Sequence, residues 1–259
     1  MIEGISEIQK DLERINEWTN ENKMLLNVKK TDYMIINFTH KQFATDININ
    51  GQYLNCVDEK RLLGVTVTSD LKWDRNVELM TKQANISMRY LHSAKKFFHD
   101  TKILKQIYLT WIRNNVEFGA VVWHSSLTQE DSSKLERIQK IAVRVIMGTR
   151  YTTYEEGLKK LKLDTLHERR RKICLKFVKN SLKLKQFSKL FPVTNNEHSM
   201  RKRNGNRYVT NQHLTERYKM STIPYLQRLL NEDFHEKKKQ FKRIMSPVDN
   251  NNCYTAGKI

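Results

Sequence analysis

Carboxylates are the residues of this chain best suited to metal-dependent chemistry, but their spacing favours turns and helix caps. Two-metal phosphoryl transfer needs carboxylates close enough to share Mg²⁺ ions, and the chain contains no Asp-Asp dipeptide. Asp70 follows an expected strand and Asp74 begins an expected helix, so a turn and a cap explain them better than a metal site. Glu155 and Glu156 suit the first turn of a helix, where carboxylates are stabilised. We therefore expect no metal site.

Histidines and cysteines likewise lack the spacing of metal ligands or nucleophilic sites. The eight histidines and three cysteines (Cys56, Cys174 and Cys253) are scattered, which argues against a zinc site and a disulfide framework. The chain has no GxGxxG, GxxxxGK[ST] or GxSxG motif, so dinucleotide, P-loop and hydrolase sites are not supported. The sequence predicts no resident cofactor, no membrane span, and a reducing cytoplasmic or nuclear location.

The net charge of +19 is concentrated in the C-terminal part of the chain. Residues 1–158 hold 22 basic and 20 acidic residues, whereas residues 159–259 hold 25 and 8. A field of this kind attracts polyanions, of which nucleic acid is the commonest inside cells. The alternative is a solvated lysine-rich surface that only aids solubility.

Residues 159–189 carry the densest charge, with 12 basic and 2 acidic residues. Arginine can grip a phosphate with two parallel hydrogen bonds, and lysine acts as a point charge. Such contacts position a nucleic acid without reading its sequence. The residues expected to bind phosphate are Lys159, Lys160, Arg169, Arg170, Arg171, Lys172, Lys176 and Lys179. A solvated helix face is the competing interpretation.

The hydrophobic pattern predicts an α+β fold with a small N-terminal sheet. Apolar residues spaced by three and four predict a buried helical stripe over residues 5–26. Residues 31–68 predict a small antiparallel sheet covered by that helix, with a tight turn at Asn50-Gly51. After Asp70 the chain is expected to be mostly helical, with a cap at Asp100 or Thr101, capping boxes at Thr128 to Asp131 and Thr153 to Glu156, and a helix start at Asp164 or Thr165. The expected divisions are residues 1–70, 71–158, 159–190, and a loosely structured basic region over 191–259.

Three stretches of the chain, taken in order, form a further pattern. A tryptophan helix is followed by a leucine-asparagine-x-x-lysine-threonine turn and a strand, then by a Leu-Gly-Val hairpin, and then by a helical region. The positions concerned are Trp18, Leu26, Asn27, Lys30, Thr31, Tyr33 to Phe38, Leu63 to Val67, Leu71 to Trp73, Tyr108, Glu117 to Trp123, Leu135 to Arg144, and Leu161 to Arg171. This order of motifs resembles reverse transcriptases of non-LTR retrotransposons, including the jockey-type elements.

The resemblance implies the end of a polymerase palm (1–70), a thumb-like region (71–158) and a basic region that holds template and primer. Lys30 would match a lysine proposed to protonate the leaving pyrophosphate, although an exposed turn lysine is an equal alternative. Leu63 and Gly64 would lie near the hairpin that grips the primer end, or would form a strand bend without a ligand. The family's catalytic Asp-Asp motif has no match here. The chain alone is therefore expected to be inactive, and Mg²⁺ is implied only for the intact polymerase.

The implied partners are RNA or DNA as template–primer and the catalytic portion of the polymerase. Two alternatives remain open: a stand-alone basic helical module that binds RNA or DNA, and a helical module that binds an acidic protein.

Overall fold

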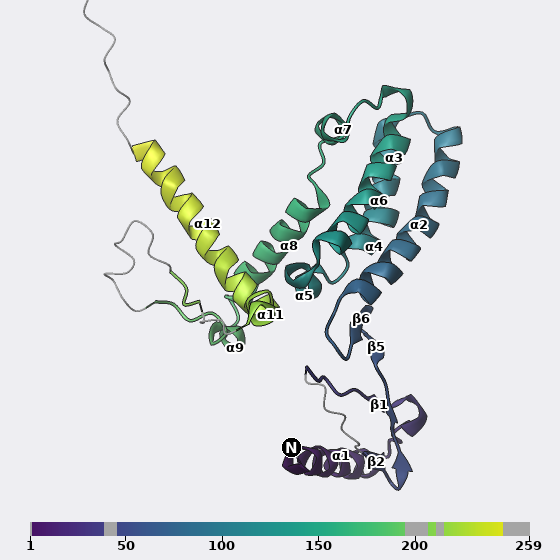
Figure 1. Ribbon diagram of the computed structural model, residues 1–259, viewed down its shortest axis with the longest axis vertical. Helices are drawn as coiled ribbons and strands as arrows, with labels where there is room; N and C mark the ends of the chain where they lie inside the picture. Colours follow the sequence, from purple (N-terminus) through teal and green to yellow (C-terminus); the bar gives the residue numbers. More distant parts are fainter. Residues whose placement is uncertain (1, 39–45, 195–206, 211–214, 246–259) are drawn as a thin grey trace, which may run out of the picture. The chain divides into compact units, whose positions relative to one another are not determined.

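The computed structural model describes residues 2–38, 46–194, 207–210 and 215–245, and has an α+β fold rich in helices (Figure 1). The chain divides into two compact units. The first unit comprises Met1–Gly119 and Thr128–Gly157, and the second comprises Ala120–Leu127 and Leu158–Ile259. The expected break near residue 158 therefore coincides with a unit boundary, whereas the one at residue 70 lies inside the first unit.

The first unit begins with helix α1 (Ile2–Glu21) and four short strands. These are β1 (Asp32–Tyr33), β2 (Asn48–Ile49), β3 (Gln52–Tyr53) and β4 (Asn55–Cys56). The predicted turn is confirmed: β2 and β3 pair antiparallel around Asn50 and Gly51, whose φ angles are +53° and +76°. The all-antiparallel prediction is wrong in one place, because β1 pairs with β4 in parallel.

The core beneath α1 is smaller than the sequence pattern suggests. Ile47, Ile49 and Leu54 form it, with Leu12 of α1 packed against them. Other members of the predicted apolar stripe stay about half exposed: Ile8 at 50%, Ile15 at 49% and Trp18 at 56%. The stripe is wider than the three-residue core that α1 covers, so only part of it is buried.

Residues 59–68 form a hairpin, whereas the hydrophobic pattern of residues 61–68 taken alone indicates one strand and the Leu-Gly-Val resemblance to the polymerase family indicates a hairpin. Strand β5 (Glu59–Leu62) pairs antiparallel with β6 (Val65–Thr68), and Leu63 and Gly64 make the turn with φ angles of +47° and +90°. Glycine adopts such angles freely, whereas leucine does so at a cost of roughly 1–2 kcal/mol. The hairpin packs on α2 through β6.

Helices make up the rest of the first unit. They are α2 (Asp74–Phe97), α3 (Thr101–Ile107), the π-helical η2 (Tyr108–Arg113), α4 (Asn114–Glu117), α6 (Gln129–Met147) and the start of α7 (Tyr154–Leu161), with short 3₁₀ turns at η1 (Val28–Lys30) and η4 (Gly148–Arg150). Two predicted caps are confirmed: the Asp100 side chain accepts a hydrogen bond from the Lys102 amide, and Thr128 accepts one from the Asp131 amide. The helices bury Val77, Leu91, Leu104, Ile112 and Ile146.

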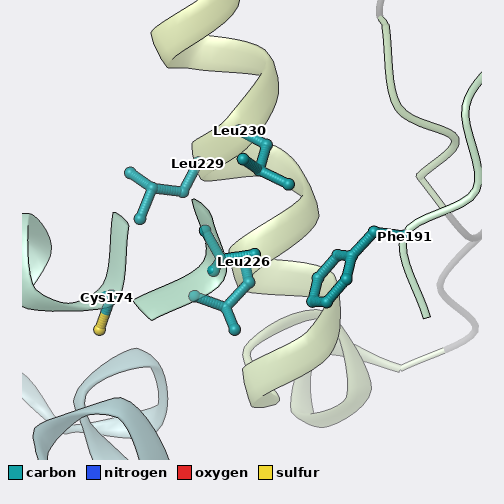
Figure 2. Packing of buried hydrophobic residues seen from close by; sticks show 6 residues of the cluster. Cys174, Phe191, Leu226, Leu229 and Leu230 are labelled. Carbon is teal, nitrogen blue, oxygen red and sulfur yellow. The ribbon is translucent and has the colours of Figure 1, made fainter. Parts of the chain in front are cut away.

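The second unit is built on two long helices, α8 (Leu166–Ser181) and α12 (Thr222–Met245). Shorter elements surround them: α5 (Ala120–Trp123), η3 (His124–Ser126), α9 (Lys185–Ser188) and α11 (Glu216–Lys219). Thr165, one of the two positions expected to start this helix, forms a capping box with Glu168 at the start of α8. Helix α8 packs against α5 and α12. The buried cluster between α8 and α12 holds Cys174, Val178, Phe191, Leu226, Leu229 and Leu230 (Figure 2).

The expectation of a loosely structured region over residues 191–259 is wrong for α12, which has 24 residues. Its apolar residues are interleaved with charged ones, and the helix is stabilised by burying Leu226, Leu229 and Leu230 against α8. None of the described helices is both long enough and apolar enough to cross a bilayer.

Candidate nucleic-acid interface

Arg170, one of the eight predicted phosphate-binding residues, is fully buried in the second unit. Its guanidinium lies 5.8 Å from the centre of the Trp123 ring, and its Nε donates a hydrogen bond of 3.3 Å to Nδ1 of His124. It is placed there because it follows Leu166 by four residues and precedes Cys174 by four, on the buried face of α8. The prediction that Arg170 contacts phosphate is therefore wrong.

His124 completes this buried cluster as a neutral ring. Burial is the main cause that lowers the pKa of His124 to about 3, and the neighbouring Arg170 and His167 contribute to the same shift. The ring meets those of His167 and Tyr225 edge-on, with centroids 5.2 and 5.7 Å away. A neutral imidazole can accept the arginine's hydrogen bond, so the arrangement holds α8 to η3.

Three more of the predicted cations are paired with carboxylates inside the second unit. Arg171 binds Glu232 of α12 at 2.8 Å, Lys179 binds Asp233 of α12 at 2.7 Å, and Lys172 binds Asp164 at 2.6 Å. The first two join α8 to α12. Part of the positive charge of this segment thus serves the unit's own packing.

The remaining four predicted cations are more available. Lys159, Lys160 and Lys176 are exposed, and Arg169 is partly buried with an interaction of its own. Of the eight predicted phosphate-binding residues, only the three lysines Lys159, Lys160 and Lys176 are therefore exposed and form no ion pair with a described residue. The basic run Arg201-Lys202-Arg203 of the sequence lies outside the described residues.

The motif residues of the resemblance occupy two separate turns in the first unit. Asn27 and Thr31 close one turn, because the Asn27 carbonyl accepts hydrogen bonds of 3.0 Å from both the Lys30 amide and the Thr31 hydroxyl. Lys30 is exposed at its end. Leu63 and Gly64 form the tip of the β5–β6 hairpin, where Leu63 is 98% exposed.

A pocket of about 490 Å³ opens between this hairpin and helices α2 and α4. Asn76 fixes its floor, since its buried side-chain oxygen accepts a 3.0 Å hydrogen bond from the Thr66 amide and so ties β6 to α2. Gly64 packs so tightly on Phe118 that an added Cβ would lie 2.7 Å from the ring. No carboxylate is found among the residues that line the pocket, which are Arg61, Gly64, Thr66, Asn76, Leu79, Met80, Lys82, Gln83, Ile86, Asn114, Asn115 and Phe118.

The outward face of α2 continues from this pocket as a row of cations. Lys82, Arg89 and Lys96 follow at seven-residue intervals, or about 10.5 Å along the helix. All three are exposed, and none forms an ion pair with a described residue. We call these three residues the cation row. The row was not predicted from the sequence because the net charge of residues 71–158 is low. The seven-residue spacing of the three cations could have revealed it.

Aromatic side chains run beside the cation row. Tyr90 is 57% exposed and Phe97 is 79% exposed, both on α2. Trp111 of η2 is 58% exposed and meets Tyr90 edge-on with ring centroids 5.9 Å apart. Apolar rings left in solvent next to unpaired cations suit a partner that combines negative charge with flat apolar groups.

Asp70 and Asp74, the two carboxylates weighed as metal ligands, lie at a turn and at a helix start. Asp70 accepts a 2.8 Å hydrogen bond from the Thr68 hydroxyl and a 3.1 Å bond from the Lys72 amide, and Asp74 is the first residue of α2. Across the described ranges, no three His, Cys, Asp or Glu side chains gather as metal ligands. These residues do not fit the two-Mg²⁺ site that the resemblance implies for an intact polymerase.

No protein-family model, curated protein or solved structure matches the chain. Its function is therefore inferred from the surfaces of the chain itself.

Proposed function

We propose that this chain is the C-terminal portion of a non-LTR retrotransposon reverse transcriptase and that it contributes template–primer binding. The observation that best supports the proposal is the cation row of α2 with the exposed rings beside it. The row lies in the stretch that the sequence resemblance assigns to a thumb-like region.

The cation row suits the sugar-phosphate backbone because its charges are unpaired and regularly spaced. Each lysine or arginine that neutralises a phosphate releases counterions, which favours binding without selecting a sequence. Exposed Tyr90, Phe97 and Trp111 add platforms on which unpaired bases can stack, at roughly 1–3 kcal/mol per base. Together these features favour a nucleic acid over an acidic protein.

The hairpin pocket supports the same assignment. Lys82 lines the pocket as well as starting the row, so the row and the Leu63-Gly64 tip belong to one continuous surface. The resemblance places that tip near the primer end. A leucine held at positive φ and 98% exposed gains nothing from burial within the described chain, and we interpret it as a contact for the primer strand.

The polymerase reaction itself would need carboxylates that this chain does not contribute. The family's Asp-Asp pair has no counterpart in the sequence, and two-metal chemistry depends on such ligands. In the proposal, this chain holds the template–primer while a catalytic portion with the aspartates adds nucleotides.

The test is a titration of the pure chain into an RNA template annealed to a recessed DNA primer. Blunt duplex, single strands and an acidic polypeptide are measured in parallel at low and high salt, with Mg²⁺ and nucleotides in one arm. Salt-sensitive binding that prefers the recessed end, without primer extension, is the expected result. Binding to the acidic polypeptide alone, or no binding at low salt, would refute the proposal.

A second candidate is a stand-alone RNA- or DNA-binding module, favoured by the missing Asp-Asp pair together with the open Lys159, Lys160 and Lys176 of the second unit. Equal affinity for recessed, blunt and single-stranded probes would support this candidate over the first.

A further inference from the structure

Arg207, in the second unit, is held over two aromatic rings. Its guanidinium carbon lies 5.9 Å from the ring centre of Tyr208 and 5.9 Å from that of Phe234 on α12. The side chain is exposed, and it forms no ion pair with any carboxylate of the described ranges. Rings that fix a guanidinium in this way leave its N–H donors free to bind a planar or tetrahedral anion.

The backbone around Arg207 is fixed from both sides. Buried Asn231 of α12 accepts a 2.9 Å hydrogen bond from the Tyr208 amide and donates a 3.0 Å bond to the Tyr208 carbonyl. The Arg207 carbonyl also accepts a 2.8 Å bond from the Thr194 amide. Helix α12 is itself anchored by the leucine cluster of Figure 2. Arg207 is thus presented from a rigid base.

Arg207 lines a pocket of about 220 Å³ together with Lys179, Lys237 and a single carboxylate, Asp233. Asp233 already binds Lys179 at 2.7 Å and Lys237 at 3.2 Å. Burial alone would raise the pKa of Asp233, but hydrogen bonds from the two lysines outweigh that effect and hold it below its usual range. Three cations and one carboxylate leave the pocket with an excess of two positive charges, and the guanidinium is the group without a carboxylate partner.

We propose that this pocket, the arginine clamp, binds one nucleotide of a single-stranded nucleic acid, with the phosphate on Arg207 and the base against the apolar wall. Tyr208, Phe234 and two leucines, Leu182 and Leu230, provide that wall. The volume is below the roughly 300–1,000 Å³ of sites for drug-sized ligands, so the pocket would enclose only part of one nucleotide and leave the rest of the strand in solvent. The inference rests on the proposed function, since it assigns to the second unit the strand that leaves the duplex.

Arg207→Ala in the full chain tests the clamp. Its affinity for a labelled single-stranded RNA homopolymer and for a blunt duplex is measured by fluorescence anisotropy. We expect the RNA affinity to fall about tenfold, as for loss of one charge-assisted contact, with the duplex affinity nearly unchanged. Lys185→Ala removes the same charge from an exposed residue of the second unit outside the clamp, and should leave both affinities nearly unchanged. Arg207→Lys keeps the charge but loses the planar fork, so it should resemble Arg207→Ala.

The outcomes separate the clamp from the function on which it rests. Equal small losses in Arg207→Ala and Lys185→Ala, or wild-type affinity in Arg207→Lys, would overturn the clamp while recessed-end binding through α2 still stood. Displacement of the RNA by inorganic phosphate as effectively as by a nucleoside monophosphate, at matched ionic strength, would also overturn it. If the wild-type chain binds no nucleic acid, the clamp and the proposed function both fail.

Discussion

Removing the cation row should change how strongly nucleic-acid binding depends on salt. In the variant with Lys82, Arg89 and Lys96 all replaced by alanine, three phosphate contacts are lost. Each contact with duplex DNA contributes about 0.9 to the slope of log affinity against log salt concentration, so the slope should become shallower by about 2.7. Between about 50 and 200 mM salt, the wild-type chain should therefore lose about 40-fold more affinity than the variant.

The assay is fluorescence anisotropy with a labelled duplex across a salt series. Because the three side chains are exposed and alanine favours helices, the free energy of unfolding in urea should stay within about 0.5 kcal/mol of wild type. This stability measurement separates lost contacts from lost folding.

A control variant removes three exposed cations from α6 instead, namely Arg137, Lys140 and Arg144. The control removes the same total charge from another helix of the first unit, so it separates the loss of the row from a general loss of positive charge. An unchanged slope in the α2 variant, or an equal change in the α6 variant, would refute the idea that the row is a specific phosphate-binding surface.

Four further changes test the structure. Arg170→Ala should lower the free energy of unfolding in urea by about 3 kcal/mol, because a buried, hydrogen-bonded side chain is lost, with nucleic-acid affinity unchanged; a drop in affinity without a loss of stability would restore Arg170 as a surface contact. The pKa of His124 is lowered from 6.5 to about 3, mainly by burial, so between these pH values the unfolded chain binds a proton that the folded chain does not. The free energy of unfolding should therefore be at its full value above pH 6.5 and fall by about 1.4 kcal/mol per pH unit below it. Urea unfolding of wild type and His124→Asn checks this, and an equal dependence of the unfolding free energy on pH in both proteins would contradict it. Gly64→Ala should lower the thermal unfolding midpoint, costing about 1–2 kcal/mol, because the added Cβ would meet a phenylalanine ring at 2.7 Å at a φ of +90°; an unchanged midpoint would show that the hairpin yields easily. Tyr108→Phe removes the hydroxyl that donates to buried Gln139, and urea unfolding should show a loss of about 1 kcal/mol; no loss would mean that water or another group replaces the hydroxyl.

Local features of the fold could be predicted from the sequence because they depend on residues a few positions apart. The caps at Asp100 and Thr128 and the Asn50-Gly51 turn follow from hydrogen bonds and backbone angles within one or two turns of chain. The total charge and its concentration after residue 158 are likewise properties of composition.

Elements that depend on contacts with distant segments were predicted less well from the sequence. The hydrophobic pattern alone does not reveal the hairpin at residues 59–68, because Leu63-Gly64 is a weaker turn signal than Asn-Gly; only the family resemblance indicated it. Helix α12 was missed because its apolar residues are diluted by charge, and its stability comes from packing on α8.

For the candidate sites, the sequence determined which residues could meet a polyanion, and only the tertiary structure decided which of them are available. A run of cations on a helix points in all directions, so one of them, Arg170, turned into the core while Arg171 and Lys179 found carboxylates on α12. Lys82, Arg89 and Lys96 were ordinary charged residues in the sequence, and became a row because the opposite face of α2 is buried. Burial depends on which distant segment a face meets, and that information is absent from local spacing.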